Sequence, residues 1–367
     1  MATTISATDV ELQKPLNAVL EQTFLRNAKA RCPYFAGTVP GSIQRQGGSA
    51  TIKWRRINTT ADPGGTGIGP STTALAELTG TASFMMGRDS ATAAFTDVTA
   101  TVAKYGQFYI LNEEVDLFTG WSTQDDKLME TLGIVAGRSL NRLQRDIVED
   151  NATAVFAGGV ASDGAVVTSV ATSDLDGVIL TLNTNSALTF TPMTTGSQNI
   201  GTTPILPAYW GICHPHVAAD ISKLTGFTSI EKYAGQVATA PFEFGTYSLA
   251  GQALRFLQTE DASINAGLGG TTGSTGLRGA TNIDIYTISI YGMDAIGSVG
   301  LANQHTINPF MAGDDLPTIE FIVKERGSSG VADPFNEIMT MAYKFWHTGA
   351  VLNANWARSL QVGSVDR

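Results

Sequence analysis

The stretch Ala50-Thr51-Ile52-Lys53-Trp54-Arg55-Arg56-Ile57 is the most informative part of this sequence. A second informative run covers residues 93–110. In the first run apolar and charged side chains alternate with the period of two that marks a β-strand. The second run is similarly strand-like, with apolar side chains at Phe95, Val98 and Phe108. We therefore predict two strands that form the base of a hairpin.

The connection between these strands is long and has little local pattern. Residues 58–80 are nearly all Thr, Gly, Ala, Pro and Ser, with turn chemistry at Asp62-Pro63-Gly64-Gly65 and Gly67-Ile68-Gly69-Pro70. A loop of this length is unusual inside a compact domain unless it is functional or disordered. A hairpin arm that lies on another molecule explains it better, which indicates assembly rather than catalysis.

The composition indicates a globular chain with few surface charges. The chain has 367 residues, which is long enough for two or three core-forming regions. It is 43% hydrophobic and only 15% charged. Much of the surface must then be neutral polar or apolar, and large partner interfaces would hide it. A secreted, glycan-covered or Thr/Ser-rich surface also fits. The formal charge of −10 argues against a tight, sequence-reading nucleic-acid binder.

The cysteines and the N-terminal residues give little information on function. Cys32 and Cys213 stand far apart, so they form neither a disulfide framework nor a zinc spacing, and we expect them to be reduced and buried. The first residues lack the pattern of a signal peptide, and no apolar run reaches the ~18 residues of a membrane helix. We predict synthesis in the cytoplasm and no membrane partner.

Two helices are expected in the first half of the chain. Residues 11–30 have an amphipathic stripe that includes Leu16 and Phe24, and Cys32-Pro33 ends it. Residues 125–151 carry a longer stripe and predict a helix of about 40 Å that spans a domain. Its arginines, Arg138, Arg142 and Arg145, are interpreted as a solvated face with Asp146 and Glu149 rather than a DNA track.

The second half is richer in strands. Further helices are predicted from residue 173 and over 216–224. Strands are predicted over 208–213, 253–259, 283–291, 297–302, 318–324 and within 336–352. The Gly/Thr-rich residues 267–279 should be exposed and mobile.

The ordered set of local stretches resembles a known family. It comprises 103–108 leading into Asn112-Glu113-Glu114-Val115, 134–140 in the long helix, 214–220, 291–295, and Asp333-Pro334 followed by 343–346. This order is similar to that of the major capsid proteins of tailed double-stranded DNA phages, which have the Hong Kong 97-type fold. The likeness covers residues 15–359.

The resemblance implies an α+β fold divided along the chain. Residues 1–49 would be an N-terminal arm and 50–103 an extended hairpin loop that overlaps a neighbour. Residues 104–198 would be a peripheral domain with the spine helix, 199–313 an axial domain, and 314–367 C-terminal strands that return to the peripheral domain. The first helix begins almost at once, so any scaffolding segment would be a separate protein or already cleaved.

The function that follows from the resemblance is structural. The chain would be a coat subunit that forms hexamers and pentamers of an icosahedral head, located in the virion and in the host cytoplasm during assembly. It would contact packaged double-stranded DNA weakly and non-specifically, with scaffolding, portal and cement proteins as further partners that the family allows. The alternatives are a tail-tube protein, an encapsulin-like shell or a soluble enzyme.

The residues assigned to contacts between subunits lie on the two arms. Lys53, Arg55 and Arg56, with Trp54, form a small basic-aromatic cluster on a strand edge, where charge discourages promiscuous pairing and can meet acids on one chosen neighbour. The other assigned residues are Asp62, Pro63 and Ile68 in the hairpin loop and Leu16 and Phe24 in the N-terminal arm.

Chemistry-bearing motifs are weak. The glycines over 64–69 lack the lysine of a phosphate loop, and neither a Gly-x-Ser-x-Gly elbow nor a His-Glu-x-x-His pattern occurs. Cys213, His214 and His216 are close in sequence, but a strand-to-helix turn explains them better than a metal site, which needs three or four convergent ligands. We expect no catalytic residues, no cofactor and no metal.

Overall fold

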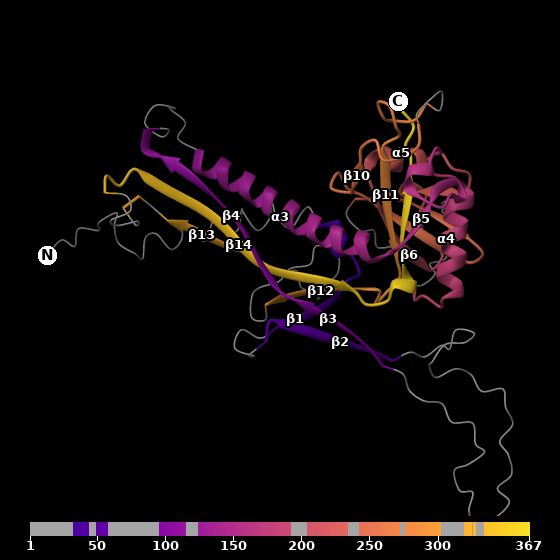
Figure 1. Ribbon diagram of the computed structural model, residues 1–367, viewed down its shortest axis with the longest axis horizontal. Coiled ribbons are helices and arrows are strands. Elements are labelled where there is room, and N and C mark those ends of the chain that lie inside the picture. Colours follow the sequence, from indigo (N-terminus) through magenta and orange to yellow (C-terminus); the bar gives the residue numbers. More distant parts are fainter. Residues whose placement is uncertain are drawn as a thin grey trace, which may run out of the picture.

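The computed structural model describes residues 32–43, 49–57, 95–114, 124–191, 204–233, 242–271, 276–301, 319–324, 326–327 and 334–367. These residues form a long sheet with one helix along it, and a second, compact sheet with two helices at one end of that assembly (Figure 1). A two-stranded ribbon lies beside the long sheet. The arrangement is of the α+β type that the sequence predicts.

Helix α3 (Gln124–Asn151) is the long helix expected over 125–151, and its position is confirmed. Its buried side chains Met129, Leu132, Ala136 and Leu140 recur at helical spacing. They pack against the row that β14 presents, Met341, Tyr343 and Phe345. At 1.5 Å per residue α3 extends for about 42 Å, so it runs along the long sheet and ends beside the compact one (Figure 1).

The long sheet has five strands organised by β14 (Ile338–Val351). Its order is β1 (Val39–Ile43), β12 (Ile296–Leu301), β14 and β13 (Ile319–Lys324), and β4 (Ala103–Asn112) also pairs with β14. The first ten residues of β14 pair with β4, and six of them also pair with β13. Its last four residues pair with β12. Strand β14 thus pairs with every other strand of this sheet except β1, which pairs with β12.

The compact sheet has eight strands. They follow the order β5 (Thr153–Phe156), β15 (Ala357–Val362), β11 (Ile285–Tyr291), β6 (Ala208–Cys213), β9 (Gln252–Gln258), β8 (Glu243–Leu249) and β7 (Phe227–Ser229), with β10 (Ile264–Asn265) paired to β11. Helices α4 (Thr172–Thr184) and α5 (Pro215–Ile221) cover one face, where Leu175, Ile179 and Val217 pack on Leu254 and Phe256. The central strands are buried on both faces, as the apolar run over 208–213 predicts.

A third core cluster joins the two sheets. Trp210, Ile212 and Leu257 on the other face of the compact sheet pack with Val148 of α3 and Ile296 of β12. Tyr34, in the short 3-10 turn η1 (Pro33–Phe35), is buried in the same cluster. Further 3-10 turns are η2 (Ala157–Gly159), η3 (Asp163–Ala165), η4 (Ile230–Lys232) and η6 (Ala354–Trp356).

The ribbon consists of β2 (Thr51–Ile57) and β3 (Phe95–Thr101), paired antiparallel with Ile57 opposite Phe95. The hairpin base that the opening sequence runs predict is therefore confirmed. The connection between these strands lies outside the described residues, as does the helix expected over 11–30.

The structure also differs from the sequence predictions. Strands β1, β5, β7, β8, β10 and β15 were not predicted, because they are short or carry charges such as Glu243 and Arg358. Helix α5 ends at Ile221, before the expected residue 224. Residues 269–270 are not mobile loop, because the Gly269 N–H bonds to the Ile283 carbonyl and the Gly270 N–H to the Val166 carbonyl.

Sheet membership follows other boundaries than the domains inferred from sequence. Strand β5, within the range assigned to the peripheral domain, and β15, near the end of the chain, both belong to the compact sheet with residues 208–291. Strand β12, within the range assigned to the axial domain, belongs to the long sheet. The terms peripheral and axial refer to a position in a capsomer and stay predictions.

Candidate assembly surfaces and the joint between the sheets

Side chains of β2, including Trp54, pack over two glycines of the long sheet, and this contact fixes the ribbon to the sheet. A Cβ atom at Gly41 of β1 would lie 2.9 Å from Ile52 Cδ1, and one at Gly297 of β12 would lie 3.0 Å from Trp54 Cζ2. Ile52 and Trp54 alternate with exposed residues and share one face of β2. Trp54, which the sequence assigned to a contact between subunits, thus packs on its own chain.

Two of the three cations of β2, Lys53 and Arg55, lie on the other face and are paired within the chain. Asp97 of β3 stands opposite Arg55, whose Nε lies 2.9 Å from Asp97 Oδ1, and Lys53 Nζ lies 2.5 Å from Oδ2. The hydrogen bonds from Arg55 and then Lys53 lower the pKa of Asp97 to about 2. Lys53 and Arg55 thus meet an acid of their own chain. The pairing with an acid of a neighbour that the sequence indicates stays a prediction.

The other residues assigned to subunit contacts, Asp62, Pro63, Ile68, Leu16 and Phe24, lie outside the described residues. Whether these residues and the exposed parts of Lys53, Arg55 and Arg56 touch a neighbour stays a prediction.

Apolar side chains are exposed on the face of the long sheet that points away from α3. Phe108 and Ile110 of β4 are 63% and 56% exposed. Their partners across the ladder, Ala342 and Thr340 of β14, alternate with the row that packs on α3. Directly opposite residues share a face in an antiparallel pair. This surface is called the outer sheet face below.

The outer sheet face continues from β4 across β14 to β13. Phe108, Ala342 and Ile322 stand side by side in one row of the three strands. Charged side chains border the apolar part, including the ion pair of Lys344 with Glu320 at 3.2 Å. An apolar centre with a polar rim is the composition of a protein–protein interface. Sequence reasoning found β4 but not that its Phe108 side stays uncovered by the described residues.

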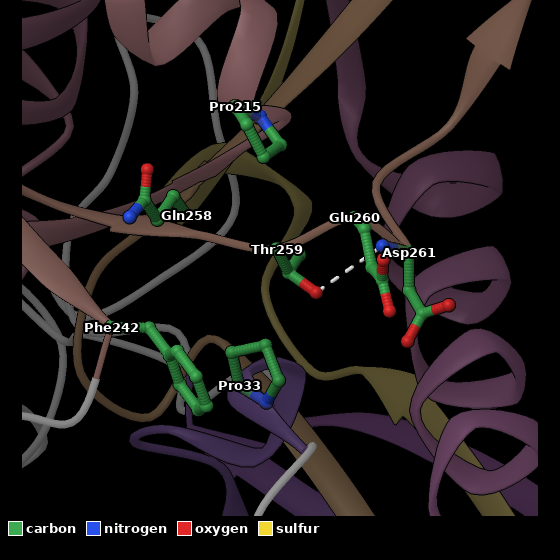
Figure 2. Close-up of a pocket in the computed structure, with 7 residues that line it drawn as sticks. All are labelled: Pro33, Pro215, Phe242, Gln258, Thr259, Glu260 and Asp261. Carbon is green, nitrogen blue, oxygen red and sulfur yellow. Dashed lines mark hydrogen bonds between the residues drawn. The ribbon is translucent and has the colours of Figure 1, made fainter. Parts of the chain in front are cut away.

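The joint between α3 and the compact sheet is built on one carboxylate. Asp261 follows β9, is only 2% exposed, and lies beside α3 in Figure 2. Its Oδ1 accepts hydrogen bonds from Arg138 Nε at 3.0 Å and Arg142 Nε at 2.9 Å. Arg145 Nη1 donates to its backbone carbonyl at 2.6 Å. All three arginines of the predicted solvated face thus also hold the loop after β9. The expected pairing with Asp146 and Glu149 is present at Arg145, and Arg142 stays half exposed.

A cavity of about 430 Å³ opens beside this joint (Figure 2). It is lined by Pro33, Pro215, Phe242, Gln258, Thr259, Glu260 and Asp261. Both carboxylates are paired with arginine, Glu260 with Arg138 at 3.4 Å, and the Thr259 hydroxyl accepts a bond from the Asp261 N–H. The lining residues therefore include no unpaired acid or activated nucleophile of the kind that hydrolysis requires.

The turn over 213–216 is a strand-to-helix turn, as interpreted from sequence. Cys213 ends β6 fully buried, and burial raises the pKa of its thiol well above the ordinary value. The imidazole rings of His214 and His216 face each other rather than the Cys213 thiol. Among the described residues no group of three or more His, Cys, Asp or Glu could hold a metal ion. No helix in the described part of the chain is both long and apolar enough to cross a membrane.

Comparison with known proteins gives the fold. No family of known sequences and no curated protein matches the chain. The capsid of cyanophage Pam1 is similar in structure, with a TM-score of 0.56 and 10% identity over 90% of this chain and 89% of that chain. The capsid of Ralstonia phage GP4 gives 0.54 and 8% identity over 90% and 87%. The chain has the Hong Kong 97-type capsid fold.

The capsid fold accounts for the unusual proportions of the molecule. A single helix and a five-stranded sheet run out from a compact domain, so the long sheet lies largely outside the compact core (Figure 1). The SrpI encapsulin of Synechococcus elongatus PCC 7942 also matches over 98% of this chain and 91% of that chain. Its TM-score of 0.41, at 9% identity, is lower than those of the two phage capsids.

We expect Asp261→Asn to destabilise the unassembled subunit by about 1–3 kcal/mol, because it leaves the guanidinium groups of Arg138 and Arg142 beside a neutral amide. The control is Asp146→Asn, which removes a 52% exposed carboxylate that pairs with Arg145 on the same helix. It should change the stability by less than about 0.5 kcal/mol. Urea unfolding of both variants measures the difference, and equal effects would contradict a joint centred on Asp261.

Proposed function

We propose that this chain is the major capsid protein of a tailed phage, which assembles into hexamers and pentamers of an icosahedral head around double-stranded DNA. The observation that carries the proposal is the fold, which is similar to two phage capsid structures over 90% of the chain. At 8–10% identity this similarity reports architecture alone. The surfaces of this chain supply the remaining support.

The outer sheet face supports assembly. Exposed aromatic and aliphatic side chains that adjoin across strands cost free energy in water, at roughly 25 cal/mol per Å² of apolar surface. A further apolar side chain, Phe335, is exposed just before β14 of the same sheet. Burial against other copies of the chain removes this cost.

Assembly of this kind relies on the number of contacts rather than on the strength of one. In a closed shell each subunit contacts several neighbours, so weak interfaces add up to a stable particle. The low charge content of the chain suits such an arrangement, because interface centres are depleted in charged residues. The role we propose is therefore structural, like that of the two capsid proteins it resembles.

Electron microscopy of the purified chain tests the proposal. We expect closed polyhedral particles when the chain is expressed, and nuclease-protected DNA inside particles from phage-producing cells. Tubes would indicate a tail-tube protein, empty shells without a DNA-filled form an encapsulin-like protein, and small discrete oligomers only would contradict a shell function.

The outer sheet face gives a second test. Ile110→Asp should leave the fold of the subunit intact, because the side chain is exposed, and should prevent shell formation by placing a charge in an interface. Leu180→Asp is the matched control, since Leu180 is 50% exposed on α4 of the compact sheet domain. Sedimentation velocity distinguishes shells from free subunits. Normal shells from Ile110→Asp, or equal loss in both variants, would contradict this role of the face.

The hairpin loop gives a third test. Deleting residues 59–80 should leave a folded subunit, because β2 and β3 keep their pairing, but one that cannot close shells if the loop overlaps a neighbour. Circular dichroism checks the fold and negative-stain microscopy checks the particles. Normal particles from the deletion variant would contradict the predicted overlap.

A further inference from the structure

Two histidines form the turn between β6 and α5, and their hydrogen bond requires a neutral imidazole. His214 is the residue before the first turn of α5, and its Nδ1 accepts a hydrogen bond from the His216 N–H at 3.2 Å. This is the bond that an N-cap side chain makes. Protonation puts a hydrogen on Nδ1 and removes the acceptor, so acid breaks the cap.

The surroundings of His214 disfavour its protonated form. The side chain is 8% exposed, and the rings of His216 and Tyr286 lie 4.4 Å and 5.4 Å from it. Burial, followed by the charges of His216 and Arg278, lowers the pKa of His214 to about 4. The cap is therefore intact at neutral pH.

Other charged groups face the same turn. His216 Nδ1 lies 3.0 Å from the Tyr286 hydroxyl, and Arg278 and Asp220 act on the pKa of His216 in opposite directions. Asp284 and Asp366 lie close enough to raise the pKa of Tyr286. The charged groups that act on His214 itself are His216 and Arg278, and both lower its pKa.

Helix α5 in turn holds the last residues of the chain. Asp220 is 6% exposed. Its carboxylate accepts bonds from the Ser364 hydroxyl and the Val365 N–H, both at 3.0 Å, and from Arg367. These three bonds depend on the position of α5. The segment over 364–367 also bonds to residues 276–278 through its backbone, so loss of the α5 contacts loosens it rather than detaching it.

We propose that the turn from His214 to His216 is an acid-sensitive switch, which holds α5 and, through Asp220, residues 364–367 at neutral pH and loosens both on acidification. An unfolded histidine titrates near pH 6.5. The opened turn therefore takes up a proton first as the pH falls below that value. The closed turn loses stability from about pH 6.5 down to about pH 4 and loses no more below it.

A local measurement is required, because His347 in the long sheet is also buried and its pKa is also lowered to about 4. The pH dependence of global unfolding would combine the contributions of His214 and His347. Amide hydrogen exchange of the full chain, expressed as protection relative to an unstructured peptide at each pH, reports on residues 215–221 and 364–367 separately from β14.

The decisive variant is His214→Asn, since asparagine is a strong N-cap acceptor that does not titrate in this range. In the unchanged chain we expect protection of 215–221 to fall at least tenfold between pH 7 and pH 4, with a smaller fall for 364–367. In His214→Asn the fall should be at least threefold smaller in both segments, and the remaining fall is the part that His216 contributes. The same loss in His214→Asn as in the unchanged chain would overturn the proposal.

A second variant tests the cap itself. His214→Ala removes the acceptor at every pH, so the protection of 215–221 should already be low at pH 7 and should not fall further in acid. Unchanged protection at pH 7 in this variant would show that the His214 bond does not hold α5, which would also overturn the proposal. Strand β14 serves as the internal reference in all three proteins.

Discussion

The structure depends on β14, because a fourteen-residue strand must satisfy its backbone hydrogen bonds on both edges while the described residues cover only one of its faces. Strands β4, β13 and β12 meet the backbone requirement in turn. Helix α3 covers the row of Met341, Tyr343 and Phe345. The opposite row keeps Phe108 and Ile110 in solvent. An apolar sheet face that stays in water costs free energy. Burial of that face against other molecules removes this cost.

The second constraint is that two separate sheets must keep one orientation. The apolar cluster with Trp210, Val148 and Ile296 fills the space between them, and Asp261 fixes the helix against the loop after β9. Buried carboxylate–arginine contacts of this kind are directional, whereas apolar packing alone tolerates sliding. The capsid fold thus combines an apolar joint with a polar contact that sets its angle, while the outer sheet face stays available.

The sequence predicted the elements whose pattern is continuous. Helix α3 has an uninterrupted apolar stripe and β2 alternates clearly, so their existence followed from periodicity. The run over 93–110 was predicted as one strand, but it divides into β3 of the ribbon and β4 of the long sheet. Strand β8 was missed because Glu243 looks like a loop residue; it is buried in a bidentate pair with Arg255 at 2.7 Å. The contact of Asp261 with Arg138 joins residues 123 apart, and periodicity holds no information on such pairs. The pair of Arg55 with Asp97 could have been found, because an antiparallel hairpin places them opposite each other.

Which face of a strand is covered depends on tertiary packing, so the exposure of Phe108 could not be inferred from its strand alone. The most direct measurement is a cryo-electron microscopy map of particles assembled from this chain. We expect density from a second copy to cover Phe108 and Ile110 in every subunit of the shell. A closed shell in which these side chains face solvent would contradict it.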